Sequence, residues 1–166
     1  MPVPLRRRHA RSCSLRRQMS SQAAQVFATP QDAEAAFYEA IERCDLEAMM
    51  AVWAADEEVV CIHPNGARLS GFERVRESWR KIFAGGQRLR FDIRDQHYVQ
   101  GPMLAIHVVH ERIVVRGGDE QPVLVVSTNV YQRVEQGWRM ILHHASPTPD
   151  APVAPTPKDE KPRVLH

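Results

Sequence analysis

Two long apolar runs near the end of the chain are separated by only three residues. Residues 123–134 and 138–144 are rich in β-branched and aromatic side chains, and Glu-Gln-Gly lies between them at 135–137. Such runs on either side of a short turn that contains glycine are typical of an antiparallel β-hairpin. The first run opens with four consecutive apolar residues, 123–126, which is too apolar for a strand with one face in water. We therefore expect this hairpin to be central, with both faces covered.

The hairpin also carries polar residues that need partners if they are buried, and this suggests a sheet that wraps around a pocket. On strict alternation, Asn129 lies on one face of its strand, and His143 and His144 lie on opposite faces of theirs. One of the two histidines must then face the pocket. We predict that it is His144, with His143 as the alternative.

The residues before the hairpin predict three helices and three further strands. Thr29 followed by proline is a helix start, and Asp45 can cap a second helix over residues 46–54. A third amphipathic helix is expected over 72–84, a short strand over 59–62, and longer strands over 88–99 and 103–115. This order predicts an α+β domain in which a curved antiparallel sheet wraps around three N-terminal helices.

Composition divides the chain into three parts. Residues 1–28 form an Arg-rich leader, 29–147 the domain, and 148–166 a Pro-rich tail, and we expect both ends to be disordered. The leader is either a mitochondrial transit peptide or sequence upstream of a true start at Met19.

Charge and cysteine content exclude several classes of protein. Six arginines lie within residues 1–18, so the rest of the chain carries 16 basic against 20 acidic residues, which argues against a nucleic-acid partner. No run approaches the roughly 18 apolar residues of a membrane span. The three cysteines form no CxxC pair and suit a cytoplasmic protein. No motif predicts a cofactor.

His63 is the candidate for chemistry. It follows an apolar strand and precedes Pro64, so its ring is expected at the pocket mouth, where a histidine can act as general acid or base near neutral pH. The alternative is a structural histidine bonded to the turn.

Five further residues are predicted to bind ligand: Trp53, Trp79, Glu111, Asn129 and His144. The two tryptophans could equally belong to the core. His107 and His110 lie on opposite faces of a strand, and Glu111 beside His107 gives only two ligands, so no metal site is predicted.

Several short motifs occur in a characteristic order: Asp45-Leu46, Cys61-Ile62-His63-Pro64, Ser127-Thr128-Asn129-Val130, and His144-Ala145-Ser146-Pro147 after Gly137-Trp138. In this series the chain resembles the SnoaL-like branch of the nuclear transport factor 2-like superfamily, a group that includes ketosteroid isomerases. The resemblance covers residues 30–147. It implies a cone-shaped domain with an internal pocket, paired as a homodimer through the outer face of the sheet.

The resemblance does not extend to the isomerase site. His63 stands where the isomerases have their acidic base, and Phe37 where they have a tyrosine. The strand over residues 123–132 lacks the second acid.

Two functions remain open. The first is a small-molecule-binding protein with an apolar pocket and a small hydrophobic ligand. The second is a lyase, isomerase or hydrolase that acts on a hydrophobic carbonyl or epoxide compound, with His63 as acid/base. The absence of a paired carboxylate favours the first.

Overall fold

The computed structural model describes residues 25–117 and 121–148. The predictions for the leader and the tail therefore lie almost entirely outside the described residues. Within them, Phe27 is buried, and its carbonyl accepts a 2.9 Å hydrogen bond from the backbone N–H of Trp138. The packed part of the chain thus already includes Phe27, two residues before Thr29.

Three helices form where capping residues and apolar spacing predict them. They are α1 (Pro30–Arg43), α2 (Leu46–Val52) and α3 (Phe72–Ala84). Thr29 and Asp32 make a reciprocal capping box at the start of α1, and the Asp45 carboxylate accepts from the N–H of Ala48 at the start of α2. These bonds use backbone N–H groups that have no partner within the helix.

Six strands form one sheet in the order β2-β1-β6-β5-β4-β3. Their bounds are β1 (Val60–Ile62), β2 (Leu69–Ser70), β3 (Leu89–Gln100), β4 (Leu104–Val115), β5 (Val123–Val134) and β6 (Gly137–Pro147). The hairpin of β5 and β6 is central, as predicted, and the α+β class is confirmed. The four long strands are antiparallel, but β1 pairs with β6 in parallel, so the sheet is mixed. The two-residue strand β2 was not predicted.

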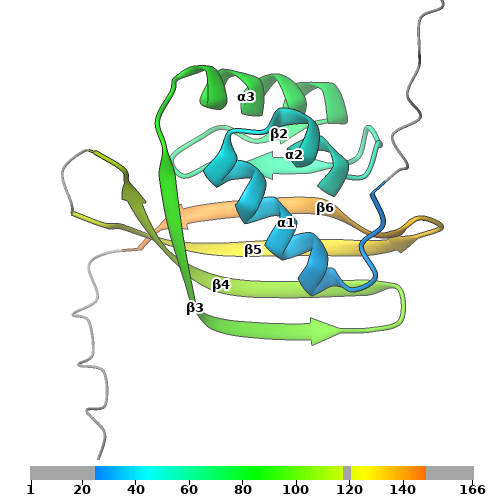
Figure 1. The fold of residues 1–166 in the computed structure, drawn as a ribbon. Helices are drawn as coiled ribbons and strands as arrows, with labels where there is room; N and C mark the ends of the chain where they lie inside the picture. Colours follow the sequence, from blue (N-terminus) through cyan, green and yellow to red (C-terminus); the bar gives the residue numbers. More distant parts are fainter. Residues whose placement is uncertain (1–24, 118–120, 149–166) are drawn as a thin grey trace, which may run out of the picture.

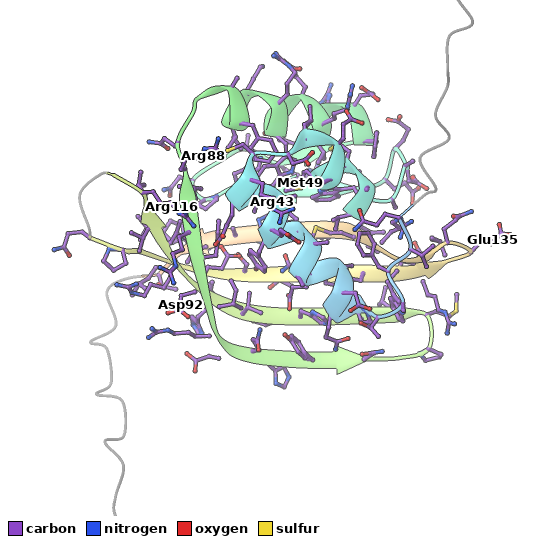
Figure 2. All side chains as sticks on the ribbon, in the orientation of Figure 1. Arg43, Met49, Arg88, Asp92, Arg116 and Glu135 are labelled. Carbon is purple, nitrogen blue, oxygen red and sulfur yellow. The ribbon has the colours of Figure 1, made fainter. Side chains whose placement is uncertain are left out.

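The helices all lie on one side of the sheet, and α1 crosses it next to the long strands (Figure 1). We call the sheet face that α1 covers the inner face. Met49 of α2, labelled in Figure 2, is fully buried in the hydrophobic core. At the C-terminal end of α1, the carbonyl of Arg43 accepts a 3.2 Å hydrogen bond from the Arg88 guanidinium (Figure 2). This bond links the start of β3 to the end of α1.

The described helices include none that is both long and apolar enough to span a bilayer. Among the described residues there is also no group of three or more His, Cys, Asp or Glu side chains placed to hold a metal ion.

Candidate functional site

A cluster of polar side chains is buried between α1 and the inner face of the sheet. Glu34 is 4% exposed, Glu111 3%, Asn129 0% and His143 4%. Tyr38, on the same face of α1 as Glu34, is also buried among them. We call these five residues the polar cluster. Burying so many polar groups is unfavourable unless they bond to one another or to a ligand.

Hydrogen bonds join the polar cluster across four elements. The Tyr38 hydroxyl donates to Glu111 Oε1 at 2.8 Å. The side-chain nitrogen of Asn129 lies 3.3 Å from Glu34 Oε1 and 3.3 Å from the Tyr38 hydroxyl. On its other side, Asn129 Oδ1 is 2.7 Å from His143 Nδ1. A single amide thus connects α1 to β6.

Two more side chains reach Glu34 from β3 and β4. The hydroxyl of Tyr98, which is partly exposed, donates to Glu34 Oε2 at 2.9 Å. The His107 ring lies 3.9 Å from the Tyr98 ring, and its Nδ1 is 3.2 Å from Glu34 Oε1 without the alignment of a hydrogen bond.

Several buried polar atoms around the polar cluster have no hydrogen-bond partner among the described residues. They are both ring nitrogens of His107 and the Tyr131 hydroxyl. Both residues are 0% exposed. Unpaired buried groups are rare in folded proteins, and each costs roughly 1–3 kcal/mol. Their presence beside the polar cluster marks this region as the candidate site.

Burial sets the protonation of these groups. It raises the pKa of Glu111, hydrogen bonds from Ser127 and Tyr38 partly oppose this rise, and the nearby charge of Glu34 adds to it. Burial, followed by the adjacent Glu111, raises the pKa of Tyr38, so this hydroxyl keeps its proton. Burial lowers the pKa of His143 to about 3, with smaller contributions from His63 and His144. The cluster therefore has a neutral imidazole and a carboxyl group that takes up a proton more readily than usual.

A β-bulge decides which histidine of β6 belongs to this site. Val130 pairs with Leu142 and Tyr131 with Met140, so Ile141 is an extra residue in the ladder. The extra residue interrupts strict alternation, and His143 faces inward after Met140. The prediction that His144 faces the pocket is therefore wrong: His144 is exposed and bonds only to Ser146 (3.3 Å) among the described residues.

A second bulge in β3 brings Tyr98 inward. The ladder with β4 shifts by one residue between Arg94 and His97, and Asp95 has a φ of 47° there. Without the shift, His97 would take the inward position. Tyr98 pairs with His107 instead, which places its hydroxyl against Glu34.

His63 lies beside the polar cluster rather than in it. Its Nε2 is 2.7 Å from the Ser78 hydroxyl, and its ring packs edge-on against Trp79, with centroids 4.8 Å apart. Burial lowers its pKa. The Trp79 ring contacts the rings of His63, Phe37 and His143, and His63 is near enough to contribute to the lowered pKa of His143.

The other predicted ligand-binding residues are divided between two places. Glu111 and Asn129 come together through Tyr38. Trp53 ends α2 and lines a separate hollow of about 440 Å³, together with Gln132 and Arg139. None of the five cluster residues lines that hollow.

The sequence analysis missed Glu34, Tyr38 and Tyr98. Glu34 and Tyr38 are four residues apart and share one face of α1. That spacing, next to the buried Phe37, was the available signal. The structure also corrects the expected absence of a paired carboxylate, because Glu34 and Glu111 occupy one cluster.

Comparisons with known proteins give three informative matches. The model of the SnoaL-like domain family matches residues 31–150. A solved structure from Thiobacillus denitrificans, provisionally named a calcium/calmodulin-dependent protein kinase type II association domain, is 43% identical. It covers 75% of this chain and 99% of its own, with a TM-score of 0.70. A provisionally named dehydratase of the nuclear transport factor 2-like family from Streptomyces avermitilis is 34% identical, covers 74% of this chain and 100% of its own, and has a TM-score of 0.66.

Among curated proteins, the F-box protein SKIP8 of Arabidopsis thaliana is 32% identical over 113 residues. That alignment covers 66% of this chain and 46% of the relative, so the chain spans less than half of that protein's length.

Proposed function

The chain belongs to the SnoaL-like domain family, and we propose that it is a small-molecule-binding protein whose polar contacts come from the buried cluster around Asn129. One observation carries this proposal. Glu34, Tyr38, Glu111, Asn129 and His143 come from four separate elements and are all buried against one another. A few convergent polar groups in apolar surroundings are typical of small-molecule sites.

The surroundings of the polar cluster favour a hydrophobic ligand. The buried rings of Phe37 and Trp79 lie next to His143. Partly buried aromatic residues continue outward from this group, with Phe83 against Trp79 and Phe91 against Tyr38. An apolar ligand could contact these rings while its polar end meets the cluster.

Fluorescence titration with 2-naphthol, an apolar two-ring hydroxyl compound, tests the proposal. Asn129→Ala removes the amide that joins Glu34 and the Tyr38 hydroxyl to His143, so we expect affinity to fall about tenfold or more. Gln132→Ala is the control, because it removes an exposed amide from the same strand. Equal affinity in the two variants, with both still folded by circular dichroism, would contradict the proposed site.

A second candidate function is acid–base catalysis on a hydrophobic carbonyl or epoxide compound. The observation in its favour is the raised pKa of Glu111, since a buried carboxyl with a raised pKa is a better proton acceptor than an ordinary glutamate. In this candidate Glu111 takes the role predicted for His63, whose Nε2 already pairs with Ser78. Turnover of styrene oxide that is lost in Glu111→Gln would favour catalysis over binding alone.

We further propose a homodimer that pairs the outer faces of two sheets. The residues that support it alternate with the buried ones on the central strands and are only half-buried: Val108, Val126, Thr128 and Val130. An apolar sheet face of this kind is usually covered by a partner. The name of the Thiobacillus relative, an association domain, agrees with self-assembly.

We propose the cytoplasm as the location. The free thiols of Cys44 and Cys61 support a reducing compartment.

A further inference from the structure

The hydrogen bonds of the polar cluster have a fixed direction. Glu34 accepts from Tyr98 and from the Asn129 amide, and Glu111 accepts from Tyr38. The side-chain nitrogen of Asn129 carries two protons, one within reach of Glu34 and one within reach of the Tyr38 oxygen. The oxygen of Asn129 therefore has to face His143.

This orientation determines the tautomer of His143. Because Asn129 Oδ1 can only accept, His143 Nδ1 carries the proton of the 2.7 Å bond between them. Protonation of both ring nitrogens is unfavourable, since burial lowers the pKa of this histidine to about 3. His143 Nε2 is then left with a lone pair, and it makes no hydrogen bond to the residues that the structure describes.

The position of His143 Nε2 limits what can bind to it. The ring is packed against Phe37, with centroids 5.0 Å apart, and lies 6.5 Å from the ring of Trp79. A donor on an apolar ring could bond to Nε2 and extend the chain of hydrogen bonds that ends at Glu111. A carboxylate would place its lone pairs against that of Nε2 and its charge near Glu34 and Glu111, both of which disfavour it.

We propose that His143 is the hydrogen-bond acceptor of the site, positioned by Asn129 and Glu34, and that the site selects neutral ligands with an O–H or N–H donor on an apolar ring. This inference rests on the proposed binding function and narrows it to hydroxyl or amine compounds. Asn129 and Glu34 act as positioning residues, because they orient His143 rather than contact the ligand atom at Nε2.

Long-range proton–nitrogen NMR of the full chain, labelled with ¹⁵N, tests the first half of this proposal without any ligand. We expect His143 Nδ1 to show the shift of a protonated nitrogen and Nε2 that of an unprotonated one. The opposite tautomer, or a doubly protonated ring at neutral pH, would overturn the inference and leave the proposed binding function intact.

Titration of the same sample separates the two proposals. Binding of 2-naphthol should change the chemical shift of His143 Nε2. The carboxylate 2-naphthoate should bind at least about tenfold more weakly and leave that chemical shift unchanged. Binding of 2-naphthol without a change at Nε2, or equal affinity for both probes, contradicts only the role of His143. If neither probe binds, both the inference and the proposed function fail.

A variant tests the positioning role. Asn129→Asp removes the amide donor and places a carboxylate beside His143 Nδ1, so we expect the ring to become protonated on both nitrogens and the preference for 2-naphthol to disappear. Gln132→Glu likewise replaces an amide with a carboxylate, at an exposed position of β5. It should leave the protonation state of His143 and the preference for 2-naphthol unchanged. An unaltered His143 resonance in folded Asn129→Asp would overturn the positioning role.

Discussion

At the scale of single residues, two adjacent histidines differ completely in environment. His143 is 4% exposed and bonded to Asn129, whereas His144 is exposed at the outer face of the sheet. Burial lowers the pKa of His143 to about 3, far below the roughly 6.5 of a histidine in an unfolded chain. Its protonation is therefore coupled to folding.

The coupling predicts acid sensitivity that depends on one side chain. Between pH 6.5 and 3 the unfolded chain binds a proton at His143 that the folded chain does not, so stability is retained above that range and falls as pH decreases through it. Two pH units below 6.5, this effect amounts to about 2–3 kcal/mol. His143→Gln should remove it, so the free energies of unfolding of wild type and variant should converge by that amount between pH 7.5 and 4.5.

Urea unfolding at the two pH values measures this difference, and His144→Gln is the matched control. The control replaces an exposed histidine one residue away and should keep the pH dependence of the wild type. A His143→Gln protein as acid-sensitive as wild type would show that other groups are responsible.

At the scale of elements, two bulges place side chains of the site. The extra residue in β6 turns His143 inward, and the shift in β3 does the same for Tyr98. Both strands form where their composition predicts a strand, but the bulges change which face of the sheet each later side chain lies on. Bulged strands are common next to binding sites, and here they bring an imidazole and a phenol to one amide and one carboxyl group.

The start of β6 gives a prediction about backbone packing. Gly137 has a φ of 96°, and a Cβ atom there would clash with the carbonyl oxygen of Phe27. Gly137→Ala should therefore break the contact between Phe27 and Trp138 in addition to straining the backbone. We expect a loss of about 2–4 kcal/mol of stability.

Gly117→Ala is the control for this substitution. Gly117 also has a positive φ, 76°, but no atom of the described residues lies within 4 Å of the added Cβ. It should cost only the backbone term of roughly 1–2 kcal/mol. Equal melting temperatures for the two variants would contradict the importance of the close contact with Phe27.

At the scale of the whole molecule, the sheet separates two surfaces of different character. The inner face holds the polar cluster beneath α1, and the outer face presents half-buried valines from the central strands. Among the described residues all three helices lie on one side of the sheet, so the outer face is available to a second copy in the proposed homodimer (Figure 1).

A charge in the centre of this outer face should prevent dimerisation. Val126→Asp places a carboxylate where two copies would meet, and burying it unpaired would weaken association by several kcal/mol. Sedimentation velocity at micromolar concentration should show a dimer for wild type and a monomer for Val126→Asp. Met103→Asp, in the exposed turn before β4, should remain dimeric. A monomeric wild type would contradict the proposed pairing.

Apart from the two-residue strand β2, the sequence by itself determined the elements and their order. Capping at Thr29 and Asp45, helical spacing over residues 72–84, and the apolar runs around Gly137 depend on neighbours within a few residues, and all of them are found in the structure. The apolar composition of residues 123–134 also predicted that the last hairpin lies at the centre of the sheet, as it does. Its outer face is only half-buried in a single copy of the chain.

Only the tertiary structure decided which polar groups meet. Glu34 and Glu111 are far apart in the sequence, and a tyrosine and an amide join them only after α1 packs on the sheet. The bulge at Ile141 leaves no signature in a uniformly apolar stretch, so alternation alone selected His144 instead of His143. A single extra residue in a ladder reverses the face of every side chain beyond it. Where that extra residue falls depends on the pairing with the partner strand rather than on the strand's own sequence.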